Sequence, residues 1–368
     1  MEIRKIEVYE LEMKLKEYFE TSFGSVQTRP VILVKVEEKN GEEGWGEVVA
    51  GEGPWYNYES YETSLIILDK YLIPIMLQAG EVSARNAWNL MKKVRGYNAA
   101  KAGLETAIWD LESKLHGKPL YKYIGGAKKR IPSGVSIGIK ESVDRLLSII
   151  SRRLEEGYIR IKIKIKPGWD LEILETIRSQ FPDIPLQVDA NAAYTLKDIN
   201  TLRQLDNYNL LMVEQPLHYE DLADHAVLAR KLSTPICLDE SIVSIYDAKA
   251  AYKLGSAEII NIKPGRVGGY TPSMEIHDFA KATGIGLWVG GMLETGVGRG
   301  HQVALATLEN FTYPNDISAS SRYWEKDIVE PEWEMKNGYI EAPEKPGIGV
   351  EVLQDHIEKI SKRKREYR

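Results

Sequence analysis

The sequence holds one cysteine, no long apolar run and no excess of positive charge. Because Cys237 is the only cysteine in 368 residues, no disulfide can form within the chain, and its apolar context PICLD predicts a buried thiol that packs as a small hydrophobic side chain. No stretch approaches the ~18 consecutive apolar residues of a membrane span. The N-terminal MEIRKIEVYELEM also lacks the apolar core of a signal peptide, so we expect a cytoplasmic protein with no membrane partner.

The charge balance argues against nucleic acid as a partner. Lysine and arginine number 48 against 54 acidic residues, a formal net charge of −6, whereas binding to a phosphate backbone needs a basic surface. The one basic run, residues 362–365, is typical of a solvated helix end. A nucleic-acid function for this tail would require that truncation before Lys362 abolish binding to a real target.

Short β-type apolar runs recur along the middle of the chain, and each ends in a charged residue. These charged residues are spaced by 25, 25, 25 and 24 positions: Lys164, Asp189, Glu214, Asp239 and Lys263. The stretches between them, such as DLEILETIRSQF, DLADHAVLARKL and SIYDAKAAYKLG, carry apolar residues at helical spacing. Tandem strand-helix units of this kind predict parallel strands joined by crossover helices.

We therefore predict an α/β fold with a (β/α)7β TIM-like barrel over residues 126–322. An open doubly wound sheet is the alternative, but it would gather only some strand ends at a switch point. Residues 1–125 predict an α+β capping domain, with a hairpin in VILVKVEEKNGEEGWGEVV and helices from about Glu59 and Ala84. Residues 323–368 are again strand and turn, and we expect them to return to the cap.

Three carboxylates follow successive strands at one register: Asp189, Glu214 and Asp239. A single acid there would most simply cap the next helix. Three of them at the C-terminal end of a barrel would repel strongly and raise each other's pKa. A hard divalent cation relieves this repulsion, and oxygen ligands without nearby His or Cys favour Mg²⁺.

Two lysines flank this acid series, Lys164 before it and Lys263 after it. A barrel would place them on opposite sides of the metal, with Lys162 on the same strand face as Lys164. A lysine serves as a base when nearby positive charge lowers its pKa. The plainer reading of Lys263 is a salt-bridge partner of Asp239. Taken together, the pattern predicts removal of the proton α to a metal-bound carboxylate, with racemisation or β-elimination as the outcome.

The strings that carry these residues resemble the enolase superfamily: KIK, VDAN, VEQP, LDES and NIKPGRVGG. A lysine at position 263 resembles the muconate-lactonizing-enzyme subgroup. The longer strings KPGWD, DANAAYT, PICLDESI and GGMLETGVGR are similar to the o-succinylbenzoate synthase / N-succinylamino acid (N-acylamino acid) racemase family, over nearly the whole chain.

The resemblance implies roles for individual residues. The Mg²⁺ ligands would be the three carboxylates, with Mn²⁺ or Co²⁺ as substitutes. Lys164 and Lys263 would exchange protons in racemisation, whereas in dehydration Lys164 would act alone as base and acid. Lys162 would tune Lys164 and help hold the substrate carboxylate. The implied substrate contacts are Asn191, Phe19, Phe23, Ser136, Arg266, Met292 and Leu293.

The resemblance also implies a small-molecule carboxylate substrate, a place in menaquinone biosynthesis and a homo-oligomer, dimer-based and up to an octamer. Arg266 matches an arginine typical of the branch that includes racemases. Other muconate-lactonizing-type cycloisomerases and dipeptide epimerases stay open as alternatives, although epimerases typically carry an Asp-x-Asp where this chain has only Asp316.

Two further alternatives are weaker. The glycine-rich GGMLETGVGRG could cradle a phosphate, but it lacks the P-loop Lys-Ser/Thr, and Glu294 would repel the phosphate. An inactive barrel that serves as a scaffold would be indicated by substitution of Lys164 or of a metal ligand, and none is substituted.

Overall fold

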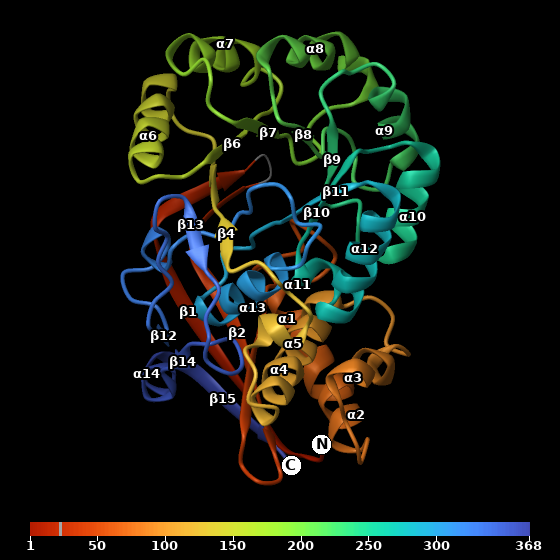
Figure 1. Cartoon of the computed structure of the whole chain (residues 1–368), viewed down its shortest axis with the longest axis vertical. Coiled ribbons are helices and arrows are strands. Elements are labelled where there is room, and N and C mark those ends of the chain that lie inside the picture. Colours follow the sequence, from red (N-terminus) through yellow and green to blue (C-terminus); the bar gives the residue numbers. More distant parts are fainter. Residues whose placement is uncertain (22–23) are drawn as a thin grey trace.

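The computed structural model describes residues 1–21 and 24–368 and divides into two parts (Figure 1). One is a cap of long antiparallel strands and helices, and the other is a half-barrel of parallel strands with helices outside it. In the described part of the chain, no helix combines the length and apolar character needed to cross a bilayer.

The cap is built on a four-stranded sheet in the order β15-β1-β2-β3. Its strands are β1 (Ile3–Thr21), β2 (Gly24–Glu38), β3 (Glu43–Val48) and β15 (Ser361–Tyr367). The predicted hairpin is confirmed, because β2 and β3 pair antiparallel across the turn at residues 39–42.

Helices cover one side of this sheet. They are α1 (Tyr61–Ile67), α2 (Ile73–Leu77), α3 (Ala84–Met91), α4 (Asn98–Leu115) and α5 (Leu120–Tyr123). Helix α4 lies directly on β3, because Gly44 and Gly46 lack the Cβ atoms that would stand 2.1 Å from the α4 carbonyls of Ala107 and Gly103. The β3–α1 connection, residues 49–60, reaches the half-barrel, where its Tyr56 hydroxyl donates to Asp239.

The half-barrel has seven parallel strands whose spatial order follows the chain without reversal. They are β5 (Gly134–Ile137), β6 (Arg160–Lys164), β7 (Leu186–Asp189), β8 (Val213–Glu214), β9 (Ile236–Leu238), β10 (Ile259–Ile262) and β11 (Gly286–Val289). A doubly wound sheet reverses its strand order at a switch point, so that alternative is wrong.

Helices follow these strands along the chain. They are α6 (Val143–Glu155), α7 (Leu171–Gln180), α8 (Ile199–Gln204), α9 (Leu222–Ala229), α10 (Ile245–Leu254), α11 (Pro264–Val267), α12 (Tyr270–Thr283) and α13 (Gly296–Ala306). Figure 1 shows α6 to α10 and α12 on the outer side and α11 and α13 next to the cap. The three helices predicted between the charged strand ends are confirmed as α7, α9 and α10. Gly255 ends α10 with a φ of +70°, a conformation that glycine adopts without strain.

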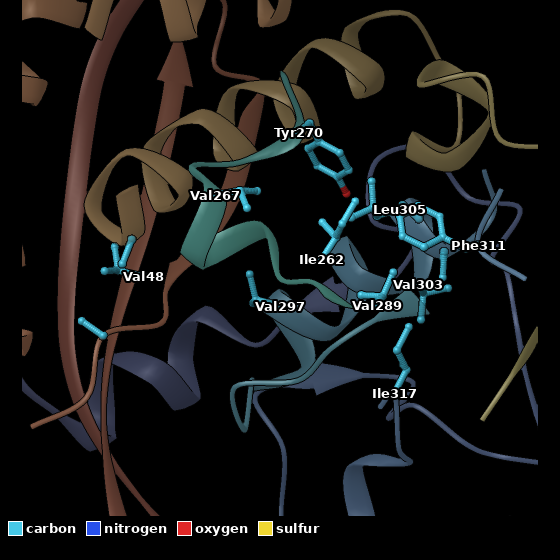
Figure 2. Close-up of a cluster of buried hydrophobic side chains, with 14 of the residues drawn as sticks. Val48, Ile262, Val267, Tyr270, Val289, Val297, Val303, Leu305, Phe311 and Ile317 are labelled. Atoms are coloured by element: carbon cyan, nitrogen blue, oxygen red, sulfur yellow. The ribbon is translucent and has the colours of Figure 1, made fainter. Parts of the chain in front are cut away.

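The segment 311–317 hydrogen-bonds to both edge strands. The Asp316 amide donates to the Val289 carbonyl beside β11 at 2.9 Å, and the Gly134 amide at β5 donates to the Asn315 carbonyl at 2.7 Å. Under these strands, side chains from β10, β11, α12 and α13 pack into one apolar cluster (Figure 2), which includes Ile262, Val289, Val303 and Phe311. Cys237 is fully buried, as predicted.

The C-terminal segment contains β12 (Val329–Glu330), β13 (Tyr339–Glu341), β14 (Glu351–Val352) and α14 (Gln354–Ile360) before β15. It returns to the cap through β15, whereas its strand β13 pairs with β4 (Arg130–Pro132). The prediction of a solvated helix end for the basic tail is wrong, because residues 361–367 form β15, which pairs antiparallel with β1. The tail's cations pair with glutamates of β1: Lys362 with Glu12, Lys364 with Glu7 and Arg365 with Glu10.

Candidate active site

Strand β6 carries the alternating sequence RIKIK, and all five of its residues are buried. Alternation sends Ile161 and Ile163 to the apolar layer under the helices and sends the cations to the opposite, inner face. Burial of a cation is costly unless it is paired. The partners of these cations therefore define the interior of the half-barrel.

Lys164 meets the first of the predicted metal ligands. Its Nζ donates to Asp189 Oδ2 at 2.6 Å and to Asn191 Oδ1 at 2.7 Å. Asp189 ends β7, which is paired with β6 in register Lys164 to Asp189, so a parallel ladder alone places the two side by side. Burial raises the pKa of Asp189, but Lys164 and Lys162 hold it below its usual range.

Lys162 lies one step deeper on the same face. Its Nζ is 2.9 Å from Glu214 Oε2, 2.9 Å from Asp316 Oδ2 and 3.3 Å from Asp189 Oδ2, and it lies 4.6 Å from the centroid of the Trp288 ring. Burial lowers the pKa of Lys162, but these three carboxylates raise it well above its usual value. Lys162 is therefore a permanent ammonium that balances the acids around it.

Lys263 lies on the far side of the acid series, just after β10. Its Nζ donates to Asp239 Oδ2 at 2.7 Å. Burial lowers the pKa of Lys263, but Asp239 and Tyr56 raise it above its ordinary value. In this arrangement Lys263 is held as an ammonium, which is able to give a proton.

The carboxylates crowd one another as well as the lysines. Burial and the neighbouring Asp189 raise the pKa of Glu214 to about 8, with Asp239 adding to the rise and Lys162 opposing it. Burial, Asp239 and Asp189 likewise raise the pKa of Glu240 to about 7. Four acids that perturb one another in a single buried place are typical of a functional site.

The chemistry of these side chains fits a hard divalent cation. Within residues 1–21 and 24–368, no group of three or more His, Cys, Asp or Glu side chains is already arranged around a metal position, and Asp189 and Asp239 each turn an oxygen to a lysine. The donors are nevertheless all oxygens, their mutual repulsion calls for positive charge, and Glu240 Oε2 is buried without a hydrogen-bond partner. The residues therefore fit Mg²⁺.

Arg160 lies at the bottom of this charged cluster, below Lys162 on β6. It is buried, its Nη1 pairs with Asp316 Oδ1 at 2.7 Å, and its Nη2 donates to the Pro314 carbonyl at 3.0 Å. Gly134 makes room for it, since a Cβ there would lie 2.5 Å from the guanidinium carbon of Arg160. Burial raises the pKa of Asp316, but Arg160 and Lys162 hold it below its usual range.

A cavity of about 460 Å³ opens above the lysines, between the cap and the half-barrel. Most of the residues implied as substrate contacts line it, namely Phe19, Ser136, Asn191, Met292 and Leu293, together with Lys162, Lys164 and Lys263. Ser136 donates to Asp316 Oδ2 at 2.7 Å. Phe23 falls outside the described residues.

Arg266 does not line this cavity in the part of the chain that the structure describes. It lies behind Asp239, whose Oδ1 it contacts, and its Nε donates to the Ile242 carbonyl at 2.7 Å. The structure thus brings Arg266 to the acid cluster from outside and not to the substrate space.

In the glycine-rich turn after β11, the amide of Met292 is not free to bind a phosphate. The Met292 amide donates to both oxygens of Glu294, at 2.8 and 2.9 Å. Burial raises the pKa of this carboxyl group. An amide that is already bonded to a carboxylate is a poor anion donor, which weakens the phosphate-cradle alternative.

Four residues of the site were not predicted in these roles: Tyr56, Asp316, Glu240 and Arg160. Glu240 stands beside Asp239 in LDES, so its neighbour was a signal. Asp316 was considered only as half of an Asp-x-Asp, and its ion pair with Arg160 joins distant segments. Tyr56 lies between Trp55 and Tyr58 in the loop GEGPWYNY, and no spacing distinguishes it from these neighbours.

Comparison with known proteins places this geometry in a family. Residues 3–125 match the mandelate racemase / muconate lactonizing enzyme N-terminal domain, and residues 146–356 match the enolase C-terminal domain-like family. An o-succinylbenzoate synthase of Geobacillus kaustophilus is 50% identical over 351 residues, 95% of this chain and 94% of that protein. An N-succinylamino acid racemase of an Amycolatopsis species is 44% identical over 362 residues, 98% of each chain. A solved enolase-superfamily member from Listeria innocua superimposes with a TM-score of 0.96 at 37% identity, covering 100% of this chain and 99% of that one.

Proposed function

Because this chain belongs to the enolase superfamily, with both mandelate racemase / muconate lactonizing enzyme domains, we propose that it is an enzyme that abstracts the proton α to a carboxylate. The expected outcomes are racemisation of N-succinyl or N-acyl amino acids, dehydration to o-succinylbenzoate, or both. The observation that carries the proposal is the placement of Lys164 and Lys263 on opposite sides of one buried group of carboxylates, beneath a cavity.

The lysines supply the proton transfers. One neutral lysine takes the α-proton, which leaves an enediolate, and the opposite ammonium returns a proton to the other face. No net change in protonation of substrate plus enzyme results, only inversion. In dehydration Lys164 takes the α-proton and then gives it to the departing hydroxyl, which leaves as water, while Lys263 offsets the negative charge.

We assign Asp189, Glu214 and Asp239 as the residues that would hold Mg²⁺, with Mn²⁺ or Co²⁺ as substitutes. When bound, the ion would supply Lewis-acid stabilisation of the negative charge that develops on the substrate carboxylate. The raised pKa of Glu214, about 8, supports the assignment, because a cation among these acids removes the repulsion that causes it.

The substrate space can be assigned in outline. Phe19, Phe23, Met292 and Leu293 would form its apolar wall, and Ser136 and Asn191 its polar side; among these, Phe23 is assigned from the resemblance alone. The Asp-x-Asp expected of dipeptide epimerases is absent from the sequence near Asp316, and Asp316 is tied to Arg160 and Lys162. This pairing favours an N-acyl group over the free ammonium of a dipeptide at that position.

We also propose the finer points of architecture and setting. The segment 311–317 would be the eighth strand of a (β/α)7β barrel over residues 126–322, supported by its hydrogen bonds to β5 and β11. Residues 1–125 and 323–368 would form the cap. The setting would be the cytoplasm and the menaquinone pathway, and the assembly a dimer-based homo-oligomer up to an octamer.

Steady-state assays test the proposal. Purified protein with Mg²⁺ should invert N-succinyl or N-acetyl amino acids, followed by polarimetry, or consume the cyclohexadiene precursor of o-succinylbenzoate, followed by absorbance. EDTA should abolish either activity and Mg²⁺ should restore it. A Lys263→Ala variant that still racemises would refute the two-lysine scheme.

A further inference from the structure

The cap reaches the half-barrel through the segment 51–58, which follows β3 in the sequence GEGPWYNY. Two of its tyrosines touch the other part of the molecule. The Tyr58 hydroxyl donates to Glu220 in the loop after β8, and the Tyr56 hydroxyl donates to Asp239 Oδ1 at 2.9 Å. Tyr58 is 70% exposed, whereas Tyr56 lines the cavity. The inner tyrosine therefore extends from the cap into the acid–lysine group.

Tyr56 holds Lys263 in two ways. Its hydroxyl accepts from Lys263 Nζ at 3.0 Å, and the ammonium lies 4.4 Å from the centroid of its ring. The same hydroxyl accepts from Arg266 Nη1 at 3.2 Å. A lysine side chain has four rotatable carbon–carbon bonds, so two contacts of this kind restrict where its ammonium can stand.

The other lysine is held differently. Lys164 donates to Asp189 Oδ2 and Asn191 Oδ1, and both acceptors belong to β7 and the loop after it. Lys263 is held by Asp239 from the half-barrel and by Tyr56 from the cap. The cap segment therefore acts on one lysine of the pair and not symmetrically on both.

We propose that Tyr56 is a positioning residue for Lys263, through which the cap acts on proton transfer on one face of the substrate. The inference rests on the proposed two-lysine function. Loss of the hydroxyl frees the ammonium to move, and displacements near 1 Å in a reacting group cost up to about 100-fold in rate. The loss should fall on the face that Lys263 serves.

The test follows deuterium uptake at the α-carbon by NMR in D₂O, with Mg²⁺ and each enantiomer of an N-succinyl amino acid. Lys263→Ala first identifies the hand whose α-proton faces Lys263, as the one that no longer exchanges. Tyr56→Phe, which keeps the ring, should slow α-proton exchange of that enantiomer by about 10- to 100-fold. The exchange rate of the other enantiomer should change by less than about threefold. Tyr58→Phe is the matched control and should leave both hands within about twofold.

A second measurement separates positioning of the lysine from bracing of the proposed metal ligand. The rise in melting temperature on adding Mg²⁺ should be the same in Tyr56→Phe as in the wild type. The positioning role would be overturned if Tyr56→Phe slowed α-exchange of both enantiomers equally and also reduced the rise in melting temperature caused by Mg²⁺. It would also be overturned if the exchange rates of both enantiomers stayed unchanged. If the wild-type protein takes up no deuterium, the proposed function fails instead.

Discussion

Lysines and acids meet in two regions of this molecule, at the edge of the cap sheet and inside the half-barrel. At the cap edge, Glu7 is 2% exposed and lies between Lys35 at 2.7 Å and Lys364 at 2.8 Å. Burial raises the pKa of Glu7, but its hydrogen bonds to these two cations lower it to about 2. Here cations outnumber the acid, and the acid stays charged.

Inside the half-barrel the ratio is reversed around Glu214, although Asp189 and Asp239 beside it each contact two cations. Glu214 pairs with Lys162 but lies among Asp189 and Asp239, and its pKa rises to about 8. Both regions contain salt bridges by distance alone. The difference shows that pairing alone identifies a structural contact, whereas crowding of like charges identifies a place built to receive a cation and to move protons.

Replacing one lysine in each region should give the largest contrast. Lys164→Ala removes the proposed base, so kcat for racemisation and dehydration should fall by about 10²- to 10⁴-fold. Lys364→Ala, in the cap, should leave kcat within about twofold. The measurement is steady-state kinetics on both variants. Comparable losses in the two would erase the distinction between the regions.

Ion binding should separate the same two regions. Glu214→Gln should abolish the stabilisation of the protein by Mg²⁺, which for a ligand at 100 times its Kd is about 2.7 kcal/mol in the wild type. Glu7→Gln should retain it. Thermal unfolding with Mg²⁺ and with EDTA gives the comparison, and a full Mg²⁺ effect in Glu214→Gln would place the ion elsewhere.

Stability against pH should sharpen the account of the cap. Glu7→Gln should lower the unfolding free energy by about 1.5 to 3 kcal/mol at neutral pH, the range for hydrogen bonds to charged groups. The folded-state pKa of Glu7, about 2, lies below the ordinary value of 4.5. Its contribution is therefore present above pH 4.5 and is lost as the pH falls toward 2. The gap between wild type and variant in chemical unfolding should narrow over that window and stay constant above it.

The smallest effect should come from an exposed pair of the cap, Lys362 with Glu12. Their side chains are 59% and 48% exposed, and pairs of this kind contribute about 0 to 1 kcal/mol. Lys362→Ala should change the unfolding free energy by less than about 0.5 kcal/mol and should not alter the Mg²⁺ effect. A loss as large as that of Glu7→Gln would mean that the whole β15 edge acts as one cooperative unit.

The contrast between the regions also explains what the sequence could predict. Lys164, Asp189 and Glu214 end successive strands and Asp239 directly follows the next, so the 25-residue spacing alone brought them together. The strand β15 was missed because a run of basic residues says nothing about its partners, the glutamates of β1, which lie at the opposite end of the chain.

The residues that contact the lysines from other parts of the molecule could not be predicted from the sequence for the same reason. Tyr56 belongs to a loop of the cap, and its contact with Lys263 depends on how the two parts of the molecule dock. Arg160 lies on β6, next to the edge strand β5, and it meets Asp316 only because the segment 311–317, which contains Asp316, hydrogen-bonds to both edge strands. Periodicity describes each strand locally, and it contains no information on such long-range contacts.

The central claim is that Lys164 and Lys263 exchange the α-proton of a carboxylate substrate on opposite faces. Proton NMR in D₂O tests it most directly, with Mg²⁺ and both hands of N-succinyl and N-acetyl amino acids beside the o-succinylbenzoate precursor. We expect the wild type to introduce deuterium at the α-carbon with inversion. In Lys164→Ala we expect only one of the two enantiomers to exchange its α-proton. Loss of the precursor without any α-exchange of the amino acids would rule out the racemase, and no reaction of any substrate would contradict the account as a whole.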